Sequence, residues 1–250
     1  MSIRSASRLL VLSFFTVLIV VSAEGRQRAV RHTPAAGVTP GSCHTFALVR
    51  PGLKASYLST TPNGSATYTI TYISDTPTQS KTTQVVSTPQ GNANAVTTID
   101  GEVSGLLRGM KHIDISTSIS LPVVGTMTTE VDIDFVPSLI LGPAAGWCVG
   151  NTWSVAPVTE TVVTKAPFVL PVTSITTTVG GDGEVLAVGE MVTVPAGTFR
   201  TVKYRGVTFA NNTTQESITW TSMDHSIVVK QDSFDAIGVN VTATQLTNLQ

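Results

Sequence analysis

Residues 192–199 read Val-Thr-Val-Pro-Ala-Gly-Thr-Phe and predict a tight corner between two β-strands. Pro195 has a fixed φ and no amide hydrogen, so it suits a turn or a strand edge. Gly197 can adopt a positive φ without a steric penalty, as such a turn requires. After the corner, Val202 and Tyr204 alternate with polar residues, which indicates a strand with one buried face. We therefore interpret the chain as strands joined at corners of this kind.

The composition supports this interpretation. Charged residues make up only 12% of the chain, and 39 threonines fill much of that gap. A chain rich in threonine and valine prefers strands to helices. Because 42% of the residues are hydrophobic, the low charge does not indicate disorder. The formal net charge of −1 gives no reason to expect a nucleic acid or an anionic membrane as partner.

The first 23 residues have the features of a cleaved signal peptide. Arg4 and Arg8 precede an apolar run, and small residues follow that run up to Ala23. A membrane anchor is the alternative, but the run is shorter than the roughly 20 residues that span a bilayer. We predict cleavage near Ala23 and a mature protein that is not transmembrane, located in the periplasm or outside the cell.

The rest of the chain divides into a short tail and one domain. Residues 24–42 contain three arginines and no hydrophobic period, so they read as a flexible basic tail. Residues 43–250 are predicted to form a single antiparallel β domain with little helix, whose two similar halves meet near residues 142–153.

Two cysteines, Cys43 and Cys148, are the only ones in the chain. An even count in an exported protein predicts a disulfide between them. The alternative is a reactive thiol assisted by the neighbouring His44. Adjacent residues of an extended segment point to opposite faces, which makes that pair a poor catalytic dyad.

Two hairpins are predicted in the body of the domain. Alternation is clear over residues 113–121 and 127–135, with residues 122–125 as the connection. Further along, residues 180–183 read Gly-Gly-Asp-Gly and predict a hairpin turn between strands at residues 173–179 and 184–194.

No arrangement of residues points to catalysis or to a metal. The four histidines stand at no metal-ligand spacing; they are His32, His44, His112 and His225. The Gly-x-Ser-x-Gly pattern of a nucleophile elbow is absent from the sequence. Glu130, Asp132 and Asp134 form an acidic stripe that we interpret as a solvated strand face, since it lacks the spacing of a calcium loop. We predict no catalytic residues, no metal, no cofactor and no enzymatic activity.

Aromatic side chains spread over the predicted strands are the candidate ligand-binding residues. We assign this role to Tyr68, Tyr72, Tyr204 and Trp220, because small-molecule sites are concave and largely apolar. The alternative is that these side chains belong to an ordinary hydrophobic core.

Four short patterns together resemble a known family. They are Gly-x-x-Trp at residues 150–153, the corner at residues 190–199, Ile-Thr-Trp at residues 218–220 and Ile-Val-Val-Lys at residues 227–230. Over roughly residues 147–249 the chain resembles a family of uncharacterised exported bacterial all-β proteins. The resemblance implies a strongly curved antiparallel sheet or open β-barrel with no established activity. It supplies no catalytic residues, and it marks Trp153, Pro195, Gly197 and Phe199 as structural.

Two functional hypotheses follow. The first is an exported binding module that holds an apolar or lipid-like small molecule in the curved sheet, with the aromatic residues lining a cavity. The second is a structural or interaction protein of the cell envelope or surface, which pairs with another protein through a sheet face or edge. The second hypothesis predicts aromatic residues that contact one another and an unprotected edge strand.

Overall fold

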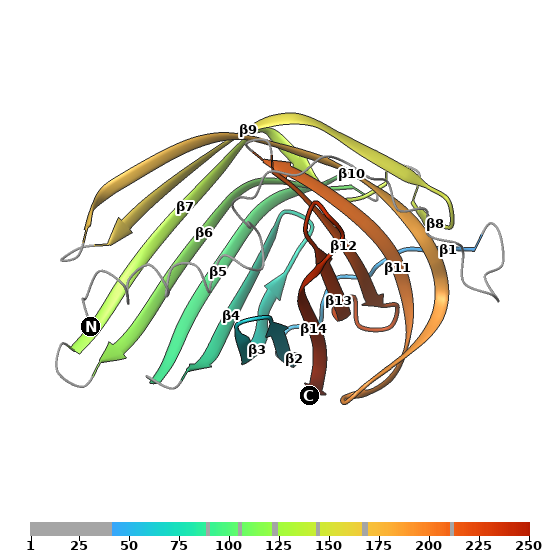
Figure 1. The fold of residues 1–250 in the computed structure, drawn as a ribbon, viewed down its shortest axis with the longest axis horizontal. Coiled ribbons are helices and arrows are strands. Elements are labelled where there is room, and N and C mark those ends of the chain that lie inside the picture. The colour runs from blue at the N-terminus through green and yellow to red at the C-terminus, as the bar shows by residue number, and fades with distance from the viewer. Residues whose placement is uncertain are drawn as a thin grey trace.

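The computed structural model describes residues 42–88, 91–104, 107–121, 125–143, 146–166, 170–210 and 213–250. All regular elements in these ranges are β-strands. Twelve strands form one antiparallel sheet that closes into a barrel (Figure 1), and β1 and β8 form a separate two-stranded sheet. The predicted all-β class with a strongly curved antiparallel sheet is confirmed. The predictions for residues 1–41, a signal peptide and a basic tail, lie outside the described residues.

The strands have the following bounds: β1 Cys43–His44, β2 Lys54–Thr61, β3 Gly64–Asp75, β4 Gln79–Thr88, β5 Gly91–Ser104, β6 Leu107–Leu121, β7 Gly125–Ile140, β8 Trp147–Cys148, β9 Thr152–Ala166, β10 Leu170–Val194, β11 Gly197–Ala210, β12 Thr213–Ser222, β13 Val228–Phe234 and β14 Asn240–Leu249.

The order around the barrel is β10-β11-β12-β13-β14-β2-β3-β4-β5-β6-β7-β9, and β9 pairs with β10 to complete the ring. Most neighbours in the ring also follow each other in the sequence, because short turns join antiparallel strands directly. The exceptions are β14 beside β2 and β7 beside β9. The first predicted hairpin is confirmed, since β6 and β7 pair with Ile113 opposite Ile133 and Ile119 opposite Met127.

The corner at residues 192–199 is the turn between β10 and β11. Val194 pairs with Gly197, and Gly197 has a φ of 133°. Pro195 is exposed in the turn, where its missing amide hydrogen costs no ladder bond. Phe199 packs beside Val192 against buried apolar residues, so the corner is anchored from inside the barrel.

The predicted hairpin turn at residues 180–183 is wrong. β10 runs without interruption through these residues. Val179 to Glu184 all pair with β11, and all of them except Gly180 pair with β9. The glycines serve a different purpose, because a Cβ at Gly180 would overlap the ring of Phe209 and one at Gly183 would overlap the ring of Trp153. Missing side chains thus allow aromatic rings to lie directly on the strand backbone.

Two clusters of buried apolar residues line the inner wall. The Tyr57 cluster comprises Val49, Leu53, Ala55, Tyr57, Val194, Ile227, Val229 and Leu246. The Ile133 cluster comprises Met110, Ile113, Val131, Ile133, Phe135, Val155, Val158 and Val179. The first cluster draws on strands β2, β10, β13 and β14 and on the segments before β2 and β13, and the second cluster draws on β6, β7, β9 and β10.

The predicted disulfide is confirmed. Cys43 and Cys148 are bonded to each other, and they pair across the small β1–β8 sheet. The bond spans 105 positions of sequence. It holds the segment before β2 against β8, where Phe46 contacts Trp147 edge to face with ring centroids 5.3 Å apart.

Candidate functional site

Tyr68 and Tyr72, two of the predicted ligand-binding residues, lie on β3 beside the Tyr57 cluster. The ring of Tyr68 stacks on that of Tyr57 at a centroid distance of 5.1 Å, and the Tyr57 hydroxyl donates a hydrogen bond to the carbonyl of Val228 at 3.1 Å. Burial raises the pKa of Tyr68 to about 12, so its hydroxyl stays protonated. These tyrosines contact protein neighbours on the inner wall.

Tyr204 belongs to a different group of aromatic residues. Its ring centroid lies 5.0 Å from that of Trp147 and 6.2 Å from that of Trp153. Burial raises the pKa of the Tyr204 hydroxyl, and side-chain hydrogen bonds to Thr219 and Thr221 oppose part of that shift. Trp147 belongs to β8, where it directly precedes Cys148, so Tyr204 connects the β1–β8 sheet to the barrel wall.

Trp220 lies on the outer face of the barrel. Residues that pair directly across neighbouring strands point to the same face of the sheet. From Tyr204 these pairs lead through Thr219, Gln231 and Thr244 to Ser59. Ser59 is two positions from Tyr57 on β2, so the whole row lies on the inner face with Tyr57. Trp220 follows Thr219 and therefore points outward.

Two lysines cover the outward ring of Trp220. The ammonium groups of Lys203 and Lys230 lie 5.0 and 4.6 Å from the ring centroid. The structure thus brings Tyr68 and Tyr72 together, places Tyr204 elsewhere inside and puts Trp220 outside. Their role in ligand binding remains a prediction.

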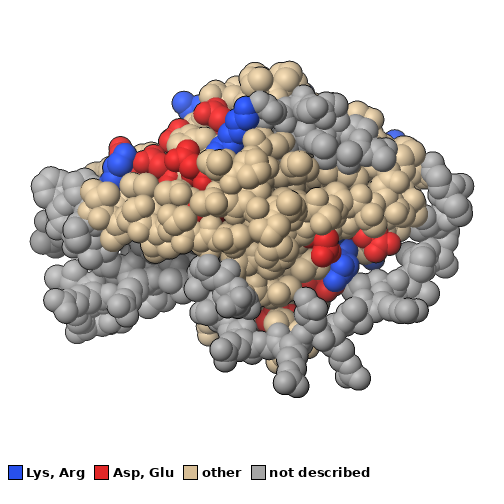
Figure 2. Space-filling view, turned by 90° about the horizontal axis from the view of Figure 1, so that it is seen from above, with Lys and Arg blue, Asp and Glu red and all other residues tan. Residues whose placement is uncertain are grey.

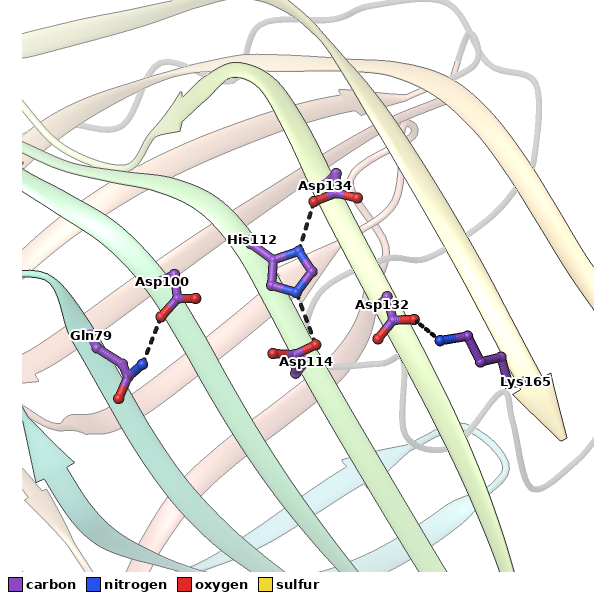
Figure 3. A network of polar contacts seen from close by, with 7 residues as sticks. All are labelled: Gln79, Asp100, His112, Asp114, Asp132, Asp134 and Lys165. Carbon is purple, nitrogen blue, oxygen red and sulfur yellow. Dashed lines mark hydrogen bonds and ion pairs between the residues drawn. The ribbon is translucent and has the colours of Figure 1, made fainter.

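Asp132 and Asp134, two residues of the predicted acidic stripe, lie on the outer face of β7. With His112 and Asp114 of β6 they form a polar cluster that the sequence did not predict. Nδ1 of His112 is 2.7 Å from Asp134 Oδ1, and Nε2 is 2.8 Å from Asp114 Oδ1 (Figure 3). Asp132, opposite Asp114 in the register, forms an ion pair of 2.8 Å with Lys165 of β9. Figure 2 shows acidic and basic side chains gathered on a mostly uncharged surface.

The two carboxylates control the protonation of His112. Partial burial disfavours the charged ring, but hydrogen bonds to Asp114 and Asp134 outweigh it and raise the pKa of His112 above its ordinary value. His112, Asp114 and Asp132 offer ligand atoms within 4.8 Å of one another. These atoms already bond to partners within the cluster or to Lys165, so the arrangement links β6, β7 and β9. Only the register could have revealed it, because His112 and Asp134 are 22 positions apart.

The carboxyl group of Glu160 lies within the apolar inner wall. Glu160 of β9 pairs with Phe135 on one side and with Thr177 on the other, and it is 2% exposed. Its Oε2 has no hydrogen-bond partner among the described residues. Because burial penalises the charged form, the pKa of Glu160 is raised. The sequence did not single out Glu160, because it resembles the other polar positions of a strand rich in threonine and valine.

Glu160 should make stability depend on pH. A raised folded-state pKa means that its favourable contribution is complete below the ordinary carboxyl pKa and is lost as pH rises through the raised value. We expect the wild type to lose stability over this window relative to Glu160→Gln. Glu160→Leu should gain about 1–3 kcal/mol at neutral pH, the penalty of an unsatisfied buried polar group. Urea denaturation from pH 4 to pH 9 measures both, and parallel wild-type and Glu160→Gln curves would contradict the expectation.

The first half of β10 presents a free edge. Residues 173–176 pair with β9 on one side, and residues 172–176 pair with no described strand on the other, because β11 ends where Ala210 meets Val179. All five residues are exposed, including Val172 at 65% and Ile175 at 62%. In Figure 1 the hairpin of β9 and β10 reaches the left side of the molecule, away from β11 and β12.

The free edge lacks the usual protection against pairing. Native proteins commonly blunt edges with charged residues, and residues 172–176 read Val-Thr-Ser-Ile-Thr without a charge. In the second half of β10, residues 187–193 also have a strand neighbour on one side only. There most side chains are buried or half-buried, and Val192 packs against the Tyr57 cluster. The first half is therefore the accessible one.

Comparison with known proteins gives only distant likenesses. No protein-family model matches the chain, and no curated protein matches it. One similar solved structure is given as an exported protein with a YmcC-like fold from Bacteroides fragilis, with 10% identity, a TM-score of 0.43 and coverage of 83% of this chain and 100% of that one. Another is given as a lipoprotein from Parabacteroides distasonis, with 14% identity, a TM-score of 0.41 and coverage of 84% and 100%. Neither likeness defines a family or a function for this chain.

The described ranges also contain no helix long and apolar enough to cross a membrane.

Proposed function

We propose that this chain is an exported, non-enzymatic interaction protein that binds an extended segment of another protein along residues 172–176 of β10. The observation that carries the proposal is the free edge itself, which is uncharged and exposed at every residue. An extended segment laid beside such an edge gains main-chain hydrogen bonds, and its alternate side chains contact the two faces of the sheet.

The contacts of the aromatic side chains support this proposal over a small-molecule carrier. Tyr68 stacks on Tyr57, Tyr204 contacts two tryptophans, and Trp220 is covered by lysines. Each predicted ligand-binding side chain therefore has protein neighbours at the distances of ordinary packing. The edge, in contrast, has unused hydrogen-bonding capacity in its backbone.

Two features support export. The sequence of residues 1–23 is typical of a signal peptide, and the disulfide between Cys43 and Cys148 is of a kind that persists in oxidising compartments. In such a compartment the edge would meet proteins of the envelope or the cell surface.

The edge should bind a nine-residue peptide of alternating valine and threonine. We expect hydrogen exchange of the amides at residues 172–176 to slow when the peptide is added, because new main-chain hydrogen bonds protect them. Val172→Lys and Ile175→Lys should weaken binding, since a charge at an edge disfavours strand pairing. Hydrogen exchange with mass spectrometric detection locates the protected segment.

Val85→Lys is the matched control. Val85 is an exposed valine of β4 that has paired strands on both sides, so its replacement should leave peptide binding unchanged. Protection confined to other strands, or equal binding by Ile175→Lys and the wild type, would refute the proposal. Circular dichroism of each variant verifies that the barrel has formed.

A further inference from the structure

An apolar row on the inner wall leads directly to the free edge. It crosses five strands through cross-strand partners, in the order Ile99, Ile113, Ile133, Val162 and Ile175. The middle of the row is fully buried, with Ile113 and Ile133 at 0% and 1%, whereas Ile175 at its end is exposed. A strand added beside β10 would continue this row, and its residue opposite Ile175 would be covered if it were apolar.

Glu160 lies on the same inner face, two positions from Val162. It is buried beside Phe135 and Val158, and its Oε2 is without a hydrogen-bond partner among the described residues. Lys165, another residue of β9, does not reach it, because that side chain pairs with Asp132 on the outer face. A buried carboxyl group without a hydrogen-bond partner costs free energy, so a partner that supplies a complementary donor is strongly favoured.

We propose that the segment bound at the free edge carries a lysine or arginine on its inward face, next to an apolar residue opposite Ile175, and that this basic side chain pairs with Glu160. The inference rests on the proposed function, because it specifies the partner of the same edge. It predicts a recognition pattern of alternating residues in which one inward position is apolar and the next inward position is basic.

The dimensions allow this contact. Neighbouring strands lie about 4.8 Å apart, so an added strand stands about 10 Å from β9. The flexible four-carbon stem of lysine crosses most of that gap, and the Glu160 side chain extends toward it from the other direction. The basic residue would stand opposite Thr177, the partner of Glu160 in the register. Thr177 directly follows residues 172–176 and, like them, precedes the part of β10 that pairs with β11.

The ion pair with Glu160 would contribute mainly to the specificity of binding. A buried ion pair is favourable when its geometry and hydrogen bonds are complete, and a partner without the basic group leaves the acid buried and unsatisfied. Segments with an uncharged residue at this position are therefore disfavoured, which gives the edge a way to discriminate among extended segments.

A pair of peptides tests the inference on the wild-type protein. Both are nine-residue valine–threonine peptides that differ at one inward position, where one carries lysine and the other norleucine. Three such pairs are made, each with the substituted position at a different place along the peptide. We expect one lysine peptide to bind roughly tenfold more tightly than its norleucine counterpart, the size expected for a hydrogen bond to a charged group. Its advantage should grow as pH rises and Glu160 ionises.

Variants at Glu160 then assign the effect. Glu160→Gln should remove the lysine preference and Glu160→Asp should reduce it, whereas Asp114→Asn, which alters a carboxylate of the outer face, should retain it. Equal affinities of lysine and norleucine peptides, with protection still at residues 172–176, would overturn the inference and leave the proposed function intact. Absence of binding by every peptide would count against both. A preference that persists in Glu160→Gln would overturn the assignment to Glu160.

Discussion

Replacing both Cys43 and Cys148 by serine is expected to lower the free energy of unfolding by about 4–5 kcal/mol. The disulfide closes a loop of 105 positions, and a cross-link of that span removes much conformational freedom from the unfolded chain. The value is an upper estimate because residual structure in the unfolded state reduces the gain. Urea denaturation of the oxidised wild type and the double variant gives the difference.

The same change should loosen a defined part of the molecule. The disulfide holds β1 against β8, and Phe46 and Trp147 make their ring contact beside it. We expect faster hydrogen exchange at residues 42–50 and altered tryptophan fluorescence from Trp147. Wild type in a reducing agent is the control, and it should match the double variant in stability. A loss below 1 kcal/mol in both would contradict the loop-closure account.

The second large effect is expected at the glycines inside β10. Gly183→Ala should lower the free energy of unfolding by about 1–3 kcal/mol, because the added methyl group would overlap the ring of Trp153. That ring has little room to move, since Trp153 also contacts Trp147 and Tyr204. Gly181→Ala should cost at least as much, because its methyl group would meet the backbone carbonyl of Val207.

Gly206→Ala provides a matched control. Gly206 pairs directly with Gly183 across β10 and β11, and a Cβ there would meet only Ser217 Oγ at 3.5 Å, an ordinary contact. Its stability should therefore stay close to that of the wild type. Combining Gly183→Ala with Trp153→Leu should cost less than the sum of the single changes, because the smaller side chain removes the overlap. Strict additivity in thermal or urea denaturation would argue against the ring contact.

Local patterns predicted much of the fold. The alternation of residues 113–121 and 127–135 predicted the β6–β7 hairpin, because a strand with one buried face needs an apolar residue at every second position. Pro195 and Gly197 predicted the β10–β11 corner, since few other residues suit such a turn. The disulfide was predicted from an even count of two cysteines in a chain with a predicted signal peptide.

The glycines of β10 show where local patterns fail. Residues 180–183 have the composition of a turn, yet all four pair with β11, and all except Gly180 pair with β9. The deciding factor is a contact with distant residues, the rings of Trp153 and Phe209, and tertiary packing of this kind overrides local preference.

The candidate sites depended even more on tertiary structure. Tyr204 and Trp220 both read as inward aromatic residues, but the register across four strands places them on opposite faces. His112 met Asp134 only through the pairing of β6 and β7. The free edge exists because β10 extends past the end of β11, and no pattern of residues predicts this difference in the lengths of the two strands.

By itself, the sequence determined the all-β class, the β6–β7 hairpin, the β10–β11 corner and the disulfide pair, because these depend on period-two alternation, turn residues and cysteine count. Only the tertiary structure decided that the ring closes through β9 and β10, that Oε2 of Glu160 lies in an apolar wall without a hydrogen-bond partner among the described residues, and that residues 172–176 have no described strand on the side away from β9. The physical reason is that register and closure arise from hydrogen bonds between strands far apart in the sequence, and a one-residue shift in pairing would send every side chain to the other face.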